Sequence, residues 1–167
     1  MRKLRHLIYL IILIAFDQLT KYFAVTQLKN EPITIIPNVF KLLYHENTGA
    51  VWGILSDRTE LLVVFSSIVM IAMIFFYFKI PADRHYNYLR IVLVFLTAGA
   101  IGNLIDRIFR KYVVDFLYFE LIDFPIFNVA DCYVTVASVA LIILFLFYYK
   151  DEDFEFIGKK KKHEVSE

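Results

Sequence analysis

The sequence predicts an all-α membrane protein: a bundle of four transmembrane helices with a small extracytoplasmic β-sheet and an outer segment that lies on the membrane surface. Hydrophobic residues make up 59% of the 167 positions, and aromatic residues make up 17%. A soluble domain is about 45–50% apolar, so this chain has more apolar surface than one globular core can bury. The formal net charge of +1 gives no basis for nucleic-acid binding. We therefore expect membrane lipid, and no nucleic acid, among its partners.

Four apolar runs each match the length of a helix that crosses a hydrocarbon core of roughly 30 Å. The first run follows a basic start and is similar to a secretory signal peptide. It ends in Asp17-Gln18-Leu19-Thr20-Lys21 and has no small-residue cleavage site, so we expect it to remain in the protein. The predicted spans are about 7–26, 60–79, 89–109 and 129–149.

The distribution of basic residues predicts the orientation of the bundle. Four spans place both termini on one side, and eleven of the 18 lysine and arginine residues fall on that side. Basic residues collect in cytoplasmic loops, so both termini are predicted to be cytoplasmic. We interpret residues 1–150 as one domain, 27–58 and 110–128 as extracytoplasmic, and 151–167 as a charged cytoplasmic tail.

The first outer segment has the composition of a β-hairpin. Ile33–Ile36 and Val39–Tyr44 are rich in β-branched and aromatic residues, and Pro37-Asn38 separates them as a turn. The following stretch, Asn47–Gly53, contains two glycines that allow close backbone approach, and its Trp52 suits the membrane interface. A small sheet followed by a glycine-containing loop is therefore expected.

The second outer segment begins with a strand-like stretch, Tyr112–Phe116. Leu117–Phe127 then mixes aromatic, aliphatic and acidic residues, which favours a segment lying on the membrane surface. Asn128 can cap the last helix.

The third span carries a polar stripe. Gly99, Gly102, Asn103, Asp106 and Arg107 fall at i, i+3, i+4, i+7 and i+8, which is one face of a helix. Small residues let a neighbouring backbone come close, and ionisable groups inside a membrane usually face the bundle interior. The alternative is that the last two residues only anchor the helix at the interface.

Polar residues also mark the first and last spans. Asp17 and Lys21 are four residues apart and can pair on one helix face. The pair is either structural or a brace for another group. Asn128, Asp131, Thr135 and Ser138 form a second stripe on the last helix.

Asp115 and Asp131 are the candidate catalytic residues, because the predicted topology brings both to one membrane face. Two neighbouring carboxylates cannot both ionise cheaply, so such a pair shares a proton. One member can then activate water while the other donates to a carbonyl oxygen, which is acid–base hydrolysis of an amide. A proton-coupled transporter would also use intramembrane aspartates, but the sequence has no internal repeat. A purely structural scaffold leaves the polar stripes unexplained.

Other chemistries find little support in the sequence. No histidine lies near a plausible serine nucleophile, and no HExxH motif is present. We interpret His6 and His85 as solvated loop residues and Cys132 as a buried structural thiol. No metal and no cofactor is expected.

Five short motifs together resemble those of bacterial lipoprotein signal peptidase, also called signal peptidase II. They occur in the family's order and cover the chain except its tail. Val51 and Ala98 depart from the usual alanine and glycine of the family. The motifs are Asp17-x-x-Thr20-Lys21, Asn47-x-Gly49-Ala50-x-Trp52-Gly53, Gly99-x-x-Gly102-Asn103-x-x-Asp106-Arg107, Val113-Val114-Asp115-Phe116 and Phe127-Asn128-x-Ala130-Asp131.

The resemblance implies an aspartyl protease of the bacterial inner or cytoplasmic membrane, with its active site near the extracytoplasmic face. It implies diacylglyceryl-modified prolipoproteins as substrates, cut just before the lipidated cysteine. We expect a monomer. The implied catalytic dyad is Asp115 and Asp131. The residues implied to bind substrate or support the dyad are Asp17, Lys21, Asn47, Gly49, Gly99, Asn103, Asp106, Arg107, Val113, Asn128 and Ala130.

Overall fold

The computed structural model describes residues 2–49 and 58–158. Within these ranges, four helices are long and apolar enough to cross a membrane, as predicted. The first begins before the expected span, because the basic N-terminal residues continue the helix. The helices are α1 (Arg2–Gln27), α2 (Thr59–Lys79), α3 (Asn87–Arg110) and α4 (Val129–Phe147).

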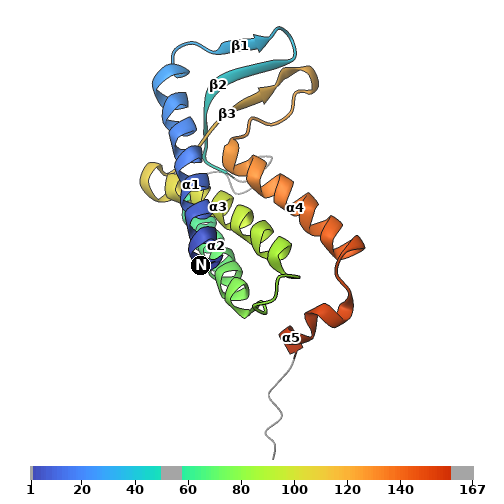
Figure 1. Ribbon diagram of the computed structural model, residues 1–167. Coiled ribbons are helices and arrows are strands. Elements are labelled where there is room, and N and C mark those ends of the chain that lie inside the picture. The colour runs from blue at the N-terminus through green and yellow to red at the C-terminus, as the bar shows by residue number, and fades with distance from the viewer. Residues whose placement is uncertain (1, 50–57, 159–167) are drawn as a thin grey trace, which may run out of the picture.

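Helix α3 is the centre of the bundle. It packs against α1, α2 and α4 (Figure 1). In its most apolar window 56% of the residues are buried, against at most 17% in the other three helices. The outward faces of those helices expose large apolar side chains such as Phe65 and Phe147, which suits them to contact lipid. The polar stripe of α3 therefore lies in the protein interior.

The outer segments form an antiparallel sheet at one end of the bundle (Figure 1). The predicted hairpin is present as β1 (Ile33–Ile36) and β2 (Phe40–Asn47), with Asn38 at φ 60° in its turn. The strand-like stretch becomes β3 (Val113–Phe119), which pairs with β2. The sheet order in the described residues is β1-β2-β3.

Part of the Leu117–Phe127 stretch, expected to lie on the membrane surface, belongs to the sheet. Residues 117–119 continue β3, and Phe127 bonds back to Leu117 through two backbone hydrogen bonds of 2.8 and 3.0 Å. Only the short 3-10 helix η2 (Glu120–Ile122) stands out from the sheet, with Leu121 and Ile122 exposed. The pairing of residues 117–119 within the sheet was not expected from composition.

The start of the expected charged tail packs against the end of the bundle opposite the sheet. Residues 151–158 form η3 (Asp151–Phe154) and α5 (Glu155–Gly158). Phe154 and Phe156 pack on a cluster built around Tyr149. The tail is therefore anchored by aromatic contacts over this stretch, whereas Lys159 to Lys162 lie outside the described residues.

Both histidines interpreted as solvated loop residues have structural partners. His6 is 2% exposed, and its Nδ1 lies 2.8 Å from the hydroxyl of Tyr77. His85 lies 3.1 Å from Asp153 and stacks on Tyr148. The interpretation was wrong for His6, because helix α1 starts at Arg2 and places His6 inside the helix bundle. His85 does lie in the turn between α2 and α3, with 37% of its side chain exposed.

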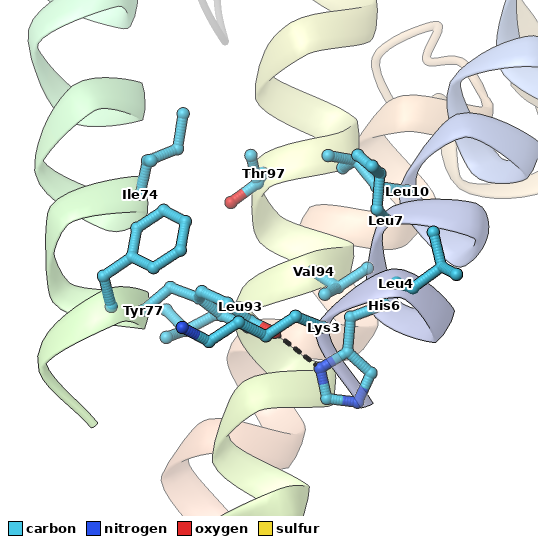
Figure 2. Close-up of a pocket in the computed structure, with 11 residues that line it drawn as sticks. Lys3, Leu4, His6, Leu7, Leu10, Ile74, Tyr77, Leu93, Val94 and Thr97 are labelled. Atoms are coloured by element: carbon cyan, nitrogen blue, oxygen red, sulfur yellow. Dashed lines mark hydrogen bonds between the residues drawn. The ribbon is translucent and has the colours of Figure 1, made fainter. Parts of the chain in front are cut away.

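An apolar groove of about 490 Å³ opens between α1 and α2, with α3 as its floor. Figure 2 shows that Leu7 and Leu10 line it from α1 and Ile74 from α2. The His6–Tyr77 contact lies at one end of the groove, near Lys3. The groove contains none of the predicted site residues.

Candidate active site

Asp115 and Asp131 come together where the sheet meets the start of α4, and one amide contacts both residues. The Nδ2 of Asn128 donates to Asp115 Oδ1 at 2.6 Å. The Oδ1 of the same amide accepts from the backbone N–H of Asp131 at 3.0 Å. The two aspartates are thus held by a common side chain although they come from β3 and α4.

A capping box at the N-terminus of α4 explains the position of Asn128. Its backbone is extended, and its own N–H donates to Asp131 Oδ2 at 3.1 Å, so the two side chains cap the helix reciprocally. This arrangement leaves only the Nδ2 of Asn128 for another partner. The cap therefore turns that N–H group toward Asp115.

Two further asparagines complete the donors around the carboxylates. Asn47 of β2 donates to Asp115 Oδ2 at 2.8 Å, and Asn103 of α3 donates to Asp131 Oδ1 at 2.8 Å. Among the described residues, no lysine or arginine is hydrogen-bonded to either aspartate. The pair is held by neutral amides and not by cations.

The environment of Asp115 favours its protonated form. Its side chain is buried, with only 1% of the residue exposed. Burial, followed by the nearby charge of Asp131, raises the pKa of Asp115 to about 7, although hydrogen bonds from Asn47 and Asn128 act in the opposite direction. Near neutral pH, the Asp115 carboxyl group can therefore hold a proton.

Lys21 is the centre of a buried ionic network directly behind the pair. Its side chain is 0% exposed, and its Nζ lies 3.0 Å from Asp17 and 3.1 Å from Asp106. The same ammonium donates to Asn103 Oδ1 at 2.9 Å. Because Asn103 also bonds to Asp131, the network reaches the candidate dyad through one residue.

The two carboxylates paired with Lys21 also hold the backbone beside each candidate aspartate. Asp17 Oδ1 accepts from the N–H of Ala130, which precedes Asp131, at 2.9 Å. Asp106 Oδ2 accepts from the N–H of Val114, which precedes Asp115, at 3.1 Å. One carboxylate thus fixes the start of α4 and the other fixes β3. The Asp17–Lys21 pair predicted from spacing is present and has this bracing geometry.

The glycines of the α3 stripe provide the close approach that this network needs. A Cβ on Gly99 would lie 2.6 Å from the carbonyl oxygen of Ala130, and a Cβ on Gly102 would overlap the carboxylate of Asp17. Helices α1 and α4 can therefore approach α3 only where it lacks side chains.

Arg107 acts on the loop beside the site. Its guanidinium donates to the carbonyl oxygen of Gly49 at 3.1 Å, and the Gly49 N–H donates to Asn47 Oδ1 at 3.0 Å. Arg107 therefore reaches Asp115 through the loop and Asn47. Val113 is buried and pairs with Asn47 in the sheet. The remaining loop residues of interest, Val51, Trp52 and Gly53, lie outside the described residues.

Two residues of the network were not predicted from the sequence. Gln18 donates to Asp17 Oδ2 at 3.2 Å and to the Gly102 carbonyl at 3.1 Å. Arg110 lies 3.4 Å from Asp106 Oδ1. Arg110 is four residues after Asp106, so the spacing that suggested the Asp17–Lys21 pair also applies to it.

Residues suited to bind a metal do not gather near this network. No group of three or more histidine, cysteine, aspartate or glutamate side chains in the described ranges could hold a metal ion. Cys132 follows Asp131 but is only half-buried, which corrects the expectation of a fully buried thiol. The arrangement offers two carboxyl groups, amide donors and backbone braces for acid–base chemistry.

Comparison with known proteins identifies the family. The model of the signal peptidase II family matches residues 9–147. Lipoprotein signal peptidases of Staphylococcus aureus strains JH9 and Newman are each 38% identical over 140 residues, which cover 81% of this chain and 84% of theirs.

Two solved structures of bacterial membrane enzymes, obtained by the in meso method at 2.3 and 1.9 Å resolution, are similar in fold. The first has a TM-score of 0.76 at 32% identity and covers 97% of this chain and 94% of its own. The second has a TM-score of 0.75 at 34% identity, with 87% and 94% covered. The chain therefore belongs to the signal peptidase II family and is a multi-pass bacterial membrane protein.

Proposed function

We propose that this chain is an aspartyl endopeptidase that removes signal peptides from diacylglyceryl-modified prolipoproteins. It cuts the peptide bond on the N-terminal side of the lipidated cysteine. The observation that carries the proposal is the buried pair Asp115 and Asp131, held by the Asn128 amide at the junction of the sheet and α4. Membership of the family supports the substrate class.

The geometry suggests different roles for the two carboxyl groups. The first turn of α4 favours negative charge on Asp131, so its carboxylate takes a proton from the attacking water. Asp115, with a pKa raised to about 7, donates its proton to the carbonyl oxygen of the scissile bond. Water oxygen bonds to the carbonyl carbon, and the C–N bond breaks when the leaving nitrogen takes the proton held by Asp131. The hydroxyl proton then returns to Asp115.

The supporting residues keep these two groups in register. Asn103 and Asn128 orient the carboxylates, and Asn47 holds Asp115 from the side of β2. Asp17, Lys21 and Asp106 fix the backbone on which the dyad stands. Such positioning is worth orders of magnitude in rate, because a misplaced catalytic group loses its near-attack geometry.

The position of the sheet fits a substrate that arrives within the membrane. We place both termini in the cytoplasm and the active site near the extracytoplasmic face of the cell membrane, in a monomer. Exposed apolar side chains on β1 and η2, including Ile35 and Leu121, can contact lipid at that face. A substrate anchored by its diacylglyceryl group can then present its scissile bond at the level of the headgroups.

The test uses purified full-length protein in detergent and a synthetic prolipoprotein peptide carrying diacylglyceryl-cysteine. Mass spectrometry should show two products, separated just before the lipidated cysteine, without added metal or nucleotide. Asp115→Asn and Asp131→Asn should each abolish cleavage while leaving the thermal unfolding transition cooperative. The matched control is Asp151→Asn, which removes an exposed carboxylate at the other end of the bundle and should leave the rate unchanged.

Two results would contradict different parts of the proposal. Full activity in either dyad variant would exclude the catalytic assignment. Equal cleavage of the peptide with and without diacylglyceryl would exclude lipid-dependent substrate recognition, while leaving the dyad intact.

A further inference from the structure

A basic hollow of about 1010 Å³ lies at the end of the bundle opposite the sheet. It is enclosed by the start of α1, the turn between α2 and α3, and the end of α4, at the lower end of the bundle in Figure 1. We refer to it as the arginine pocket; its lining includes Arg2, Arg5, Arg84, His85, Tyr88 and Tyr148.

Two of the three guanidinium groups in the arginine pocket have no hydrogen-bond partner among the described residues. Arg2 is engaged, because it donates to the backbone carbonyls of Ala82 and Asp83. The side chains of Arg5 and Arg84 form no hydrogen bond and no ion pair with any residue in the described ranges. Both side chains are exposed. The pocket thus presents two guanidinium groups that are free to bind an anion.

The nearest acidic side chains are occupied elsewhere, and none of them lines the pocket. Asp83 accepts from the backbone N–H of His85 at 2.7 Å. Asp153 lies 3.1 Å from the His85 ring and accepts from the N–H of Lys150 at 2.9 Å. Neither Asp83 nor Asp153 forms an ion pair with Arg5 or Arg84 among the described residues, so both guanidinium groups can take an external anion.

The pocket lies where a membrane supplies phosphate groups. It is located at the ends of three membrane-spanning helices, and tyrosines such as Tyr88 and Tyr148 are typical of the interface between headgroups and acyl chains. Leu4 and Phe147 expose apolar side chains on the adjoining helices. Guanidinium groups bind phosphate through charged, bidentate hydrogen bonds. A ligand with one phosphate and two acyl chains matches both parts of this surface.

The apolar groove in Figure 2 lacks these features. Its lysine is Lys3, and His6 and Tyr77 bond to each other. Thr97 is the remaining polar side chain in its lining. That groove can take acyl chains of any membrane lipid, but it offers little to select a headgroup. Charge complementarity therefore distinguishes the arginine pocket from the rest of the lipid-facing surface at this end.

We propose that the arginine pocket binds an anionic glycerophospholipid, with its phosphate between Arg5 and Arg84 and its acyl chains along α1 and α4. Bound there, the lipid joins the start of α1 to the turn between α2 and α3. The site is at the opposite end of the bundle from Asp115 and Asp131, and the proposal does not depend on the hydrolytic function.

Native mass spectrometry of the delipidated full-length protein in detergent tests the proposal. The protein is mixed with equimolar phosphatidylglycerol and phosphatidylcholine, and retained lipid is counted. Each basic residue near anionic headgroups contributes about 1 kcal/mol, so two predict a preference for phosphatidylglycerol of roughly 30-fold. A large excess of inorganic phosphate should not displace the lipid. Displacement by phosphate alone would show an anion site that does not require a lipid and would overturn the proposal.

The variant Arg5→Gln with Arg84→Gln should abolish this preference. Because neither side chain bonds to a described residue, its unfolding temperature in phosphatidylcholine alone should match that of the wild type. The matched control, Lys3→Gln with Lys79→Gln, removes two charges from the same end but outside the arginine pocket. If the control lost the preference for phosphatidylglycerol equally, the preference would come from general charge attraction at this end of the bundle. That result would refute a specific lipid site in the arginine pocket.

Discussion

Replacing Lys21 with methionine should destabilise the protein by about 3–5 kcal/mol, the range for removing one partner of a buried ion pair. Lys21 is 0% exposed and lies 3.0 Å from Asp17 and 3.1 Å from Asp106. Methionine fills a similar volume but leaves both carboxylates without the shared ammonium. Among the basic side chains of the described residues, Arg110, at 3.4 Å and 31% exposed, still pairs with Asp106.

The expected loss is large because both carboxylates are buried, with Asp17 and Asp106 each 0% exposed. Their remaining partners are the backbone N–H groups of Ala130 and Val114, the side-chain amide of Gln18 and the partly exposed Arg110. For a chain of this size, 1 kcal/mol corresponds to about 2–4 °C in unfolding temperature. A decrease of roughly 6–20 °C is therefore expected.

Thermal unfolding in detergent can be followed through Cys132, the only cysteine of the chain, with a thiol-specific fluorophore. The double variant Lys21→Met with Asp17→Asn removes one of the two unpaired charges. It should be more stable than Lys21→Met alone by about 0.5–3 kcal/mol, the range for coupled neighbours.

The matched control is Lys41→Met. Lys41 pairs with Glu120 at 2.5 Å, but both side chains are 29% exposed. A pair of this kind contributes at most about 1 kcal/mol. The reasoning is refuted if Lys21→Met lowers the free energy of unfolding by no more than Lys41→Met does. It is also refuted if adding Asp17→Asn to Lys21→Met lowers that free energy further.

Three further predictions concern the site itself. Asn128→Ser keeps an N-cap but loses the N–H group that donates to Asp115. Its unfolding temperature should change little, while kcat for cleavage should fall. Asn128→Ala also loses the cap and should in addition lose about 1 kcal/mol of stability. Because the pKa of Asp115 is raised from 3.8 to about 7, the native state keeps a proton that the unfolded state releases, so stability should decrease as pH rises from about 4 to about 7. Asp115→Asn should flatten that dependence in unfolding scans across this range, and an unchanged slope would contradict the raised pKa. Gly102→Ala places a Cβ on the Asp17 carboxylate and should cost about 1–3 kcal/mol, while Gly158→Ala, which meets nothing within 4 Å, should be neutral in the same scan.

Features with a short sequence period were predictable. The stripe from Gly99 to Arg107 follows the helical repeat, and the structure turns it toward α1 and α4 as expected. The Asp17–Lys21 pair follows from a separation of four residues. The cap at Asn128 is local as well, since both of its hydrogen bonds are with Asp131, three positions further along the chain.

Features that depend on contacts distant in sequence were not predictable. The pairing of β3 with the hairpin joins Asn47 to Val113, and no local pattern specifies that register. This register places residues 117–119 in the sheet, opposite Phe40–Leu42 of β2. Composition alone did not predict that pairing. His6 shows the same limit, because its partner Tyr77 lies 71 positions away.

The structure also changes the relation between the polar stripe and the dyad. The resemblance implies that both Asn103 and Arg107 bind substrate or support the dyad, but of the two only Asn103 bonds directly to a candidate aspartate. The stronger coupling runs through main-chain N–H groups, which carry no sequence signal: Asp17 holds Ala130 and Asp106 holds Val114. Asp17 and Asp106 each bond to the residue that precedes a candidate catalytic aspartate, so a shift of either side chain would also move Asp131 or Asp115. Because Lys21 pairs with both Asp17 and Asp106, its loss should let the start of α4 and strand β3 shift independently. The kcat for cleavage should therefore fall even in molecules that remain folded.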